Sequence, residues 1–124
     1  MYSPQVLDHF EHPRNVGEVA RADAAAEVEN PACGDVMRLS LKLRDGRIAE
    51  ARYRTQGCVT AIACGSRLTE LLQGRTPAEA RALRRQDLVA SLGGLSPETQ
   101  HASHLAMDAL AAVLTKLQPS RRGQ

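Results

Sequence analysis

In residues 36–43, VMRLSLKL, an apolar side chain recurs at every second position from Met37 onward. This period of two is that of a β-strand with one buried face, since successive side chains of a strand point to opposite sides of the sheet. A second alternating stretch, residues 47–55, follows after an Asp-Gly pair. The two stretches predict an antiparallel hairpin, and any fold of this chain must cover one face of it.

The connection between these strands decides which residues pair. A two-residue Asp-Gly loop would set Leu41 against Glu50, an apolar side chain opposite a charged one. A three-residue loop, Arg44–Gly46, places Ala51 opposite Leu39 instead. We therefore predict the longer loop, with its glycine in the left-handed region of backbone conformation.

Helical signals lie on both sides of the hairpin. Ser3 and Pro4 are typical of a helix start, and Pro13 ends the short helix that follows. Its predicted inner face consists of Val6, Leu7 and Phe10. Further helices are predicted over residues 59–73, 76–83, 86–92 and 96–118, the second of them with a capping box of Thr76 and Glu79.

A third strand is predicted at residues 25–29. The order of helix, strands and helices predicts an α+β domain, in which a small three-stranded antiparallel sheet packs against several α-helices. We expect this domain to cover residues 1–118 and to be followed by a mobile tail, residues 119–124.

Composition argues against several classes of function. The net charge of +2 comes without a dense basic stripe, and the aromatic residues number only two Tyr and one Phe, so we expect no nucleic-acid partner. No apolar stretch reaches membrane-spanning length and the first ten residues lack a signal-peptide pattern, so we expect no membrane and a cytoplasmic location. Three cysteines in a reducing compartment are ligands, reactive thiols or packing residues rather than a disulfide framework.

Side chains that bind metals gather where the predicted elements end. Cys33 and Asp35 lie in the turn before the first clear strand, Cys58 lies between the hairpin and the next helix, and His101 and His104 lie in the first turns of the last helix. Residues at element ends are well placed to present ligands from a rigid scaffold. Cys, Asp and His from different elements can converge on one zinc or iron–sulfur site.

Simpler interpretations of the same residues remain open. A cysteine is often a small packing residue, and an aspartate often stabilises a turn. We interpret His104 as an exposed polar residue and Cys64, inside the predicted helix, as packing rather than ligand. No phosphate loop and no serine–histidine–aspartate signature is present, so we expect no enzyme.

Four stretches together carry a specific resemblance: DHFEHPRNVG (8–17), PACGDVMRLSLKL (31–43), YRTQGCVTAIACGS (53–66) and HASHLAMDAL (101–110). In this order and spacing they resemble the U-type, NifU/IscU-like iron–sulfur cluster assembly scaffolds. The resemblance implies a small antiparallel sheet covered by helices, with the metal site at one exposed end. It also implies that a cysteine desulfurase delivers sulfur, that iron joins it, and that a labile, transient [2Fe–2S] cluster forms and passes to apo iron–sulfur acceptor proteins.

The resemblance also implies the ligands. Cys33 and Cys58 correspond to the first two cluster cysteines, Asp35 to the aspartate that keeps the cluster releasable, and His101 to the histidine before the third cysteine. The chemistry agrees, because a carboxylate oxygen matches such a cluster less well than a thiolate does. The predicted cofactor and metal ligands are therefore Cys33, Asp35, Cys58 and His101.

The chain departs from the family pattern at two places. The family has His-Cys-Ser where this chain has His101-Ala102-Ser103, so a thiolate that serves as ligand and sulfur acceptor is missing. The family's chaperone handle, Leu-Pro-Pro-Val-Lys, is replaced by Leu95–Thr99, without the lysine. This second departure argues against an Hsp70-type chaperone as a partner.

Three functions remain open at this point. The first is a scaffold or carrier in which the four predicted ligands hold the cluster, since histidine can replace cysteine on one iron. The second is a sulfur-acceptor partner of a cysteine desulfurase that binds Zn²⁺ through the same four residues. The third is a degenerate relative that keeps the fold only to bind partners.

Overall fold

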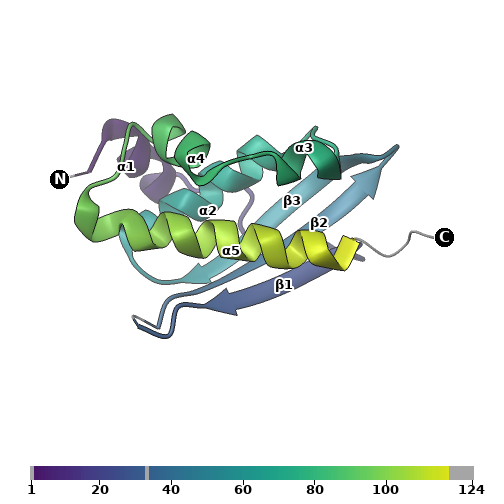
Figure 1. The fold of residues 1–124 in the computed structure, drawn as a ribbon, viewed down its shortest axis with the longest axis horizontal. Helices are drawn as coiled ribbons and strands as arrows, with labels where there is room; N and C mark the ends of the chain where they lie inside the picture. Colours follow the sequence, from purple (N-terminus) through teal and green to yellow (C-terminus); the bar gives the residue numbers. More distant parts are fainter. Residues whose placement is uncertain (1, 33, 118–124) are drawn as a thin grey trace.

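The structure, a computed structural model, describes residues 2–32 and 34–117. A three-stranded antiparallel sheet, in the order β1-β2-β3, has one face covered by helices (Figure 1). The elements are α1 Pro4–Glu11, β1 Ala24–Glu29, β2 Val36–Arg44, β3 Arg47–Gln56, α2 Val59–Leu72, α3 Pro77–Arg81, α4 Arg85–Ser91, the 3₁₀ turn η1 Pro97–Thr99, and α5 Gln100–Leu117. The predicted α+β class and the three strands are confirmed.

The long helices α2 and α5 build the core against the inner face of the sheet. α5 packs on β1 and β2, and α2 packs on β3. The alternating strand residues Met37, Leu39 and Leu41 are fully buried beneath them, as the pattern predicts. The predicted tail, 119–124, lies outside the described residues.

The hairpin turn differs from the prediction. Arg44 pairs with Arg47, so the loop consists of two residues, Asp45 with φ 55° and Gly46 with φ 78°. Two successive residues with positive φ are typical of the type I′ turn that suits a hairpin. The left-handed Gly46 is confirmed, and the three-residue loop is wrong.

The reason is a β-bulge in β3 that the sequence argument did not include. The pairing shifts between Lys42 and Leu43, where Lys42 pairs with Glu50 but Leu43 pairs with Ile48, which leaves Ala49 as an extra residue. A bulge adds one residue to one strand, so every pairing beyond it is shifted by one residue. Ala51 consequently pairs with Leu41 rather than with Leu39, and its side chain still faces the core.

The buried face of α1 is also different from the predicted one. The Ser3 side chain accepts a hydrogen bond from the Val6 amide and caps the helix, as expected. Val6 and His9 are the buried residues of the helix, whereas Leu7 and Phe10 remain 40% and 38% exposed. The helix turns His9 inward because its Nδ1 lies 2.6 Å from the buried Ser66 hydroxyl of α2. The buried face of α1 therefore combines the apolar Val6 with the polar His9.

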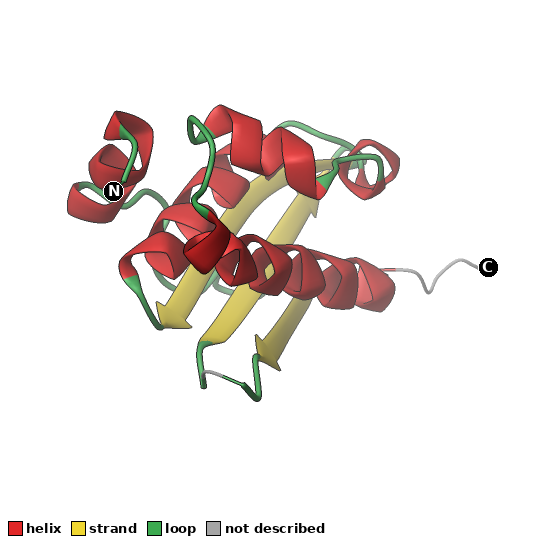
Figure 2. Cartoon of the chain, turned by 60° about the vertical axis from the view of Figure 1, so that its left-hand side comes forward, coloured by secondary structure: helices red, strands yellow, loops and turns green. Residues whose placement is uncertain are grey.

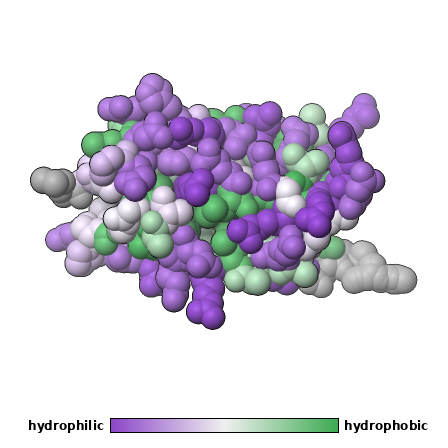
Figure 3. Space-filling model, turned by 90° about the horizontal axis from the view of Figure 1, so that it is seen from above, coloured by the Kyte–Doolittle hydropathy of each residue, from purple (hydrophilic) through white to green (hydrophobic). Residues whose placement is uncertain are grey.

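The surface carries mainly polar side chains. The face seen from above in Figure 3 is largely hydrophilic, with apolar side chains in small patches. Across the part of the chain that the structure describes, no helix combines the length and apolar character needed to cross a membrane.

Candidate metal centre

Three of the four predicted ligands meet at one end of the sheet. Asp35 precedes β2 and Cys58 follows β3, and these positions are neighbours because Val36 pairs with Gln56 in the antiparallel ladder. Figure 2 shows the loops before β2 and after β3 at the same end of the sheet. The start of α5 brings His101 to them. One potential ligand atom from each of Asp35, Cys58 and His101 lies within 4.8 Å of the other two.

The imidazole ring is central to this cluster. His101 Nε2 lies 3.8 Å from Cys58 Sγ and 3.8 Å from Asp35 Oδ2. The other ring nitrogen, Nδ1, lies 3.2 Å from the carbonyl oxygen of Glu98. A carbonyl can only accept a hydrogen bond, so Nδ1 carries the proton and Nε2 offers its lone pair to the cluster. This is the arrangement that orients a metal-binding histidine.

The loop before β2 is closed by backbone hydrogen bonds that fix Asp35. The Asn30 amide donates to the Asp35 carbonyl at 2.8 Å, and the Gly34 amide donates to the Asn30 carbonyl at 2.7 Å. The Asn30 side chain accepts from the Ala32 amide at 2.9 Å. Gly34 has φ 77°, a conformation in which glycine is favoured. The carboxylate of Asp35 is thereby held beside the end of β3.

Cys58 lies at the N-cap of α2. Its carbonyl accepts the Ile62 amide at 3.1 Å, and its side chain makes no capping hydrogen bond. The half-buried sulfur is therefore available to a ligand. The N-terminal end of a helix also favours negative charge, which suits a metal-bound thiolate.

The donor set fits a metal ion of the zinc or iron class. Carboxylate, thiolate and imidazole all bind these metals. Among the residues that the structure describes, Asp35 Oδ2 is shielded from solvent and has no hydrogen-bond partner. A buried carboxylate oxygen without a partner is costly, and a cation at this position would satisfy it. Cys33, the fourth predicted ligand, lies outside the described residues.

The remaining sequence candidates lie elsewhere. Cys64 is fully buried in α2, and burial raises the pKa of its thiol to about 12, which agrees with a packing role. His104 is exposed, as predicted. Ala102, at the position of the missing cysteine, is fully buried, and its methyl group belongs to the hydrophobic core.

Sequence reasoning missed the supports of His101. Arg85 Nη1 donates to Gln100 Oε1 at 2.6 Å and to Ser103 Oγ at 3.2 Å. These bonds tie α4 to the first turn of α5, which carries His101. These hydrogen bonds join segments that are distant in the sequence, so no local sequence pattern predicts them.

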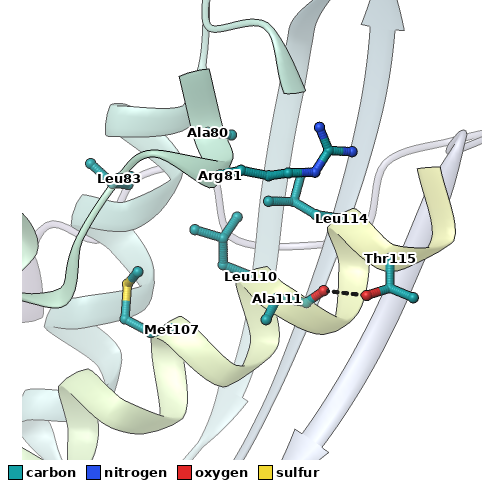
Figure 4. Close-up of a pocket in the computed structure, with 8 residues that line it drawn as sticks. All are labelled: Ala80, Arg81, Leu83, Met107, Leu110, Ala111, Leu114 and Thr115. Carbon is teal, nitrogen blue, oxygen red and sulfur yellow. Dashed lines mark hydrogen bonds between the residues drawn. The ribbon is translucent and has the colours of Figure 1, made fainter. Parts of the chain in front are cut away.

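An apolar groove between α3 and α5 is separate from this cluster (Figure 4). It has a volume of about 250 Å³, and its lining residues are Ala80, Arg81, Leu83, Met107, Leu110, Ala111, Leu114 and Thr115. The Thr115 hydroxyl donates to the Ala111 carbonyl. None of the three clustered ligands lines this groove.

Comparisons with known proteins agree with this arrangement. The family described as "NifU-like N terminal domain" matches residues 1–122. The chain is 46% identical over 110 residues to iron-sulfur cluster assembly scaffold protein IscU 1 of Archaeoglobus fulgidus, covering 89% of this chain and 72% of that protein. It is 41% identical over 127 residues to IscU of Escherichia coli K12, covering 99% and 98%.

Solved structures show the same fold. The N-terminal part of a NifU-like protein from Brucella abortus matches with a TM-score of 0.75 at 24% identity, covering 94% of this chain and 93% of that one. A putative scaffold protein for the SUF system from Fervidobacterium islandicum matches with a TM-score of 0.68 at 18% identity, covering 91% and 96%. Fold, motifs and overall identity lead to one conclusion: this chain belongs to the NifU-like N-terminal domain family.

Proposed function

We propose that this chain is an iron–sulfur cluster assembly scaffold that binds a labile [2Fe–2S] cluster and passes it to apo acceptor proteins. The relatives at 41–46% identity carry the name of such scaffolds. The observation that supports this most directly is the convergence of Asp35, Cys58 and His101 from three element ends. Cys33, close in sequence to Asp35, is the proposed fourth ligand.

The mixed donor set explains why a bound cluster would be releasable. Cys58 and Cys33 offer thiolates, His101 offers Nε2, and Asp35 offers a hard oxygen that competes poorly with sulfur for such a cluster. The His101 side chain is 37% exposed, so the site is open to an acceptor protein. Weak ligands and access from solvent are what a carrier needs, whereas a permanent cluster needs neither.

Sulfur must come from a partner, and we propose a cysteine desulfurase. The thiolate of Cys58 or Cys33 attacks the outer sulfur of the desulfurase persulfide, forms a new S–S bond, and releases the desulfurase thiolate. Ala102 cannot take part, and the Cys64 thiol is buried and fully protonated at neutral pH. We propose neither an Hsp70-type chaperone partner nor an enzymatic activity. The cytoplasm remains the expected compartment, because reduced thiols persist there.

A zinc-binding sulfur acceptor is the second candidate. The N, O and S donors around His101 Nε2 suit a tetrahedral Zn²⁺ ion as well as they suit a cluster. In that case the metal would be a permanent part of the protein, and sulfur alone would be transferred.

Anaerobic reconstitution with ferrous iron and sulfide separates these candidates. The scaffold predicts a visible charge-transfer band, two irons per cluster in the desalted protein, and loss of the band when an apo acceptor is added. Cys58→Ser should abolish the band, whereas the matched control Cys64→Ser should retain it. Tightly retained zinc without a band would favour the sulfur acceptor. If the desalted protein retains neither iron nor zinc, the chain would be a relative that only binds partners, and this result would contradict the proposal.

A further inference from the structure

Gly57, the residue before Cys58, lies directly against the carboxylate of Asp35. A Cβ atom built on Gly57 would lie 2.8 Å from Asp35 Cγ, 2.9 Å from Oδ2 and 3.1 Å from Oδ1. Real Cβ atoms essentially never approach a heavy atom outside their own and the neighbouring residues within 3.0 Å. The whole carboxylate therefore occupies the space that any other residue at position 57 would fill.

Backbone conformation does not explain this glycine. Gly57 is absent from the residues with positive φ, so an alanine could adopt its backbone conformation without strain. Gly34 and Gly74, by contrast, have positive φ and nothing within 4 Å of an added Cβ. Among the glycines that the structure describes, Gly57 is the one whose added Cβ would meet a clustered ligand.

Asp35 has little room to move away. Its side chain is only 13% exposed, and its backbone is held by the Asn30 amide on one side and by the start of β2 on the other. A methyl group at position 57 would therefore rotate the carboxylate rather than shift the loop. Because Oδ2 lies 3.8 Å from His101 Nε2, such a rotation changes the geometry of the donor set without removing a donor.

We propose that Gly57 is a positioning residue for the metal site, and this inference rests on the proposed function. The missing side chain of Gly57 forms the space in which the Asp35 carboxylate lies, and it thereby sets the placement of that carboxylate relative to Cys58 and His101. Gly57 thus positions the oxygen ligand of Asp35, and the next residue, Cys58, supplies the thiolate ligand.

The test is a double-mutant cycle on the full chain, with Zn²⁺ affinity measured by competition with a chromophoric chelator. Gly57→Ala should weaken Zn²⁺ binding about 10- to 100-fold, the range found when residues that orient metal ligands are changed. Asp35→Ala should weaken it at least as much. If Gly57 acts through Asp35, the double variant binds Zn²⁺ about as weakly as Asp35→Ala alone.

The same cycle in the metal-free protein gives a second measurement. Gly57→Ala should lower the melting temperature, because the methyl group and the carboxylate compete for one space. Removing that carboxylate in the double variant should restore most of the loss. A role of Gly57 in backbone conformation alone predicts instead that the two effects add.

Gly74→Ala is the matched control. It introduces a methyl group at a residue with φ 90° and no neighbour within 4 Å, so it strains the chain away from the site and should leave Zn²⁺ affinity unchanged. Unaltered Zn²⁺ affinity in Gly57→Ala, or additive losses in the cycle, would overturn the inference while leaving the metal site intact. Failure of the unsubstituted protein to bind Zn²⁺ would instead overturn the proposed donor set itself.

Discussion

His101 Nδ1 lies 3.2 Å from the Glu98 carbonyl oxygen, one turn earlier in the chain. This contact fixes the protonated nitrogen on one side of the ring and leaves Nε2 facing Asp35 and Cys58. The 3₁₀ turn before α5 thus determines which ring nitrogen of His101 is left to bind a metal. An oriented imidazole between a thiol and a carboxylate is the core of the proposed site.

His101→Ala should lower Zn²⁺ affinity by more than about tenfold, because it removes a ligand that lies at the centre of the cluster. His104→Ala is the matched control, since His104 is exposed on the same helix. Chelator competition on both variants measures the difference. Equal affinities in the two variants would show that His101 does not bind the metal.

Cys58 and Cys64 should differ strongly in reactivity. At about pH 8, iodoacetamide should modify Cys58 in the metal-free native protein and leave Cys64 unmodified, because burial raises the pKa of the Cys64 thiol to about 12. Mass spectrometry of the digested protein, with a denatured sample as the control, measures both sites. Native Cys64 reacting as fast as Cys58 would contradict its burial and would make it a possible substitute for the missing third cysteine.

Asp35→Cys should lengthen the lifetime of a reconstituted cluster several-fold. The substitution replaces a hard oxygen with a thiolate, a better ligand for iron–sulfur clusters. The cysteine side chain is also smaller than the carboxylate that now lies against Gly57. Decay of the visible band in the presence of a chelator gives the lifetime. A lifetime equal to or shorter than that of the unsubstituted protein would show that Asp35 does not limit cluster stability.

The buried His9 should make stability fall at low pH. Burial lowers the pKa of His9 from its usual 6.5, with a smaller contribution from Arg14, and Glu70 opposes the shift only partly. The unfolded chain therefore binds a proton at a higher pH than the folded chain does. This contribution to stability is complete above about pH 6.5 and is lost as the pH falls towards the lower, folded-state pKa.

Urea denaturation at several pH values measures this effect. The free energy of unfolding of the unsubstituted protein should decrease between about pH 7 and pH 5, and His9→Gln should reduce that decrease. Identical pH profiles for the two proteins would contradict the role of His9.

The sequence predicted those features of the fold that repeat along the chain. Alternation identified β2, and helix periodicity with capping signals such as Thr76 and Glu79 located the helices. Features that occur only once in the fold were not predicted. The extra residue Ala49 reversed the parity on which the turn prediction depended, and the His9–Ser66 contact turned α1 away from its apolar stripe.

In the candidate site, too, some residues were predicted from the sequence and others were not. Metal-binding residue types at element ends indicated the region, the resemblance to the NifU/IscU-like scaffolds implied Asp35, Cys58 and His101 as ligands, and the structure brings these three together. The supports of the site depend on contacts between distant segments. The hydrogen bonds from Arg85 leave no local pattern in the sequence. The glycine before Cys58 indicates a close approach of the backbone, but nothing local identifies Asp35 as the group it approaches.

X-ray absorption at the iron edge of the reconstituted protein tests the proposed mixed ligation most directly. Two thiolates, one imidazole and one carboxylate on a [2Fe–2S] cluster predict, for each iron, about three sulfur neighbours and one nitrogen or oxygen neighbour. His101→Ala should alter the nitrogen contribution, whereas His104→Ala should not. A shell of about four sulfurs per iron, with no light-atom ligand, would contradict the site built from Asp35, Cys58 and His101.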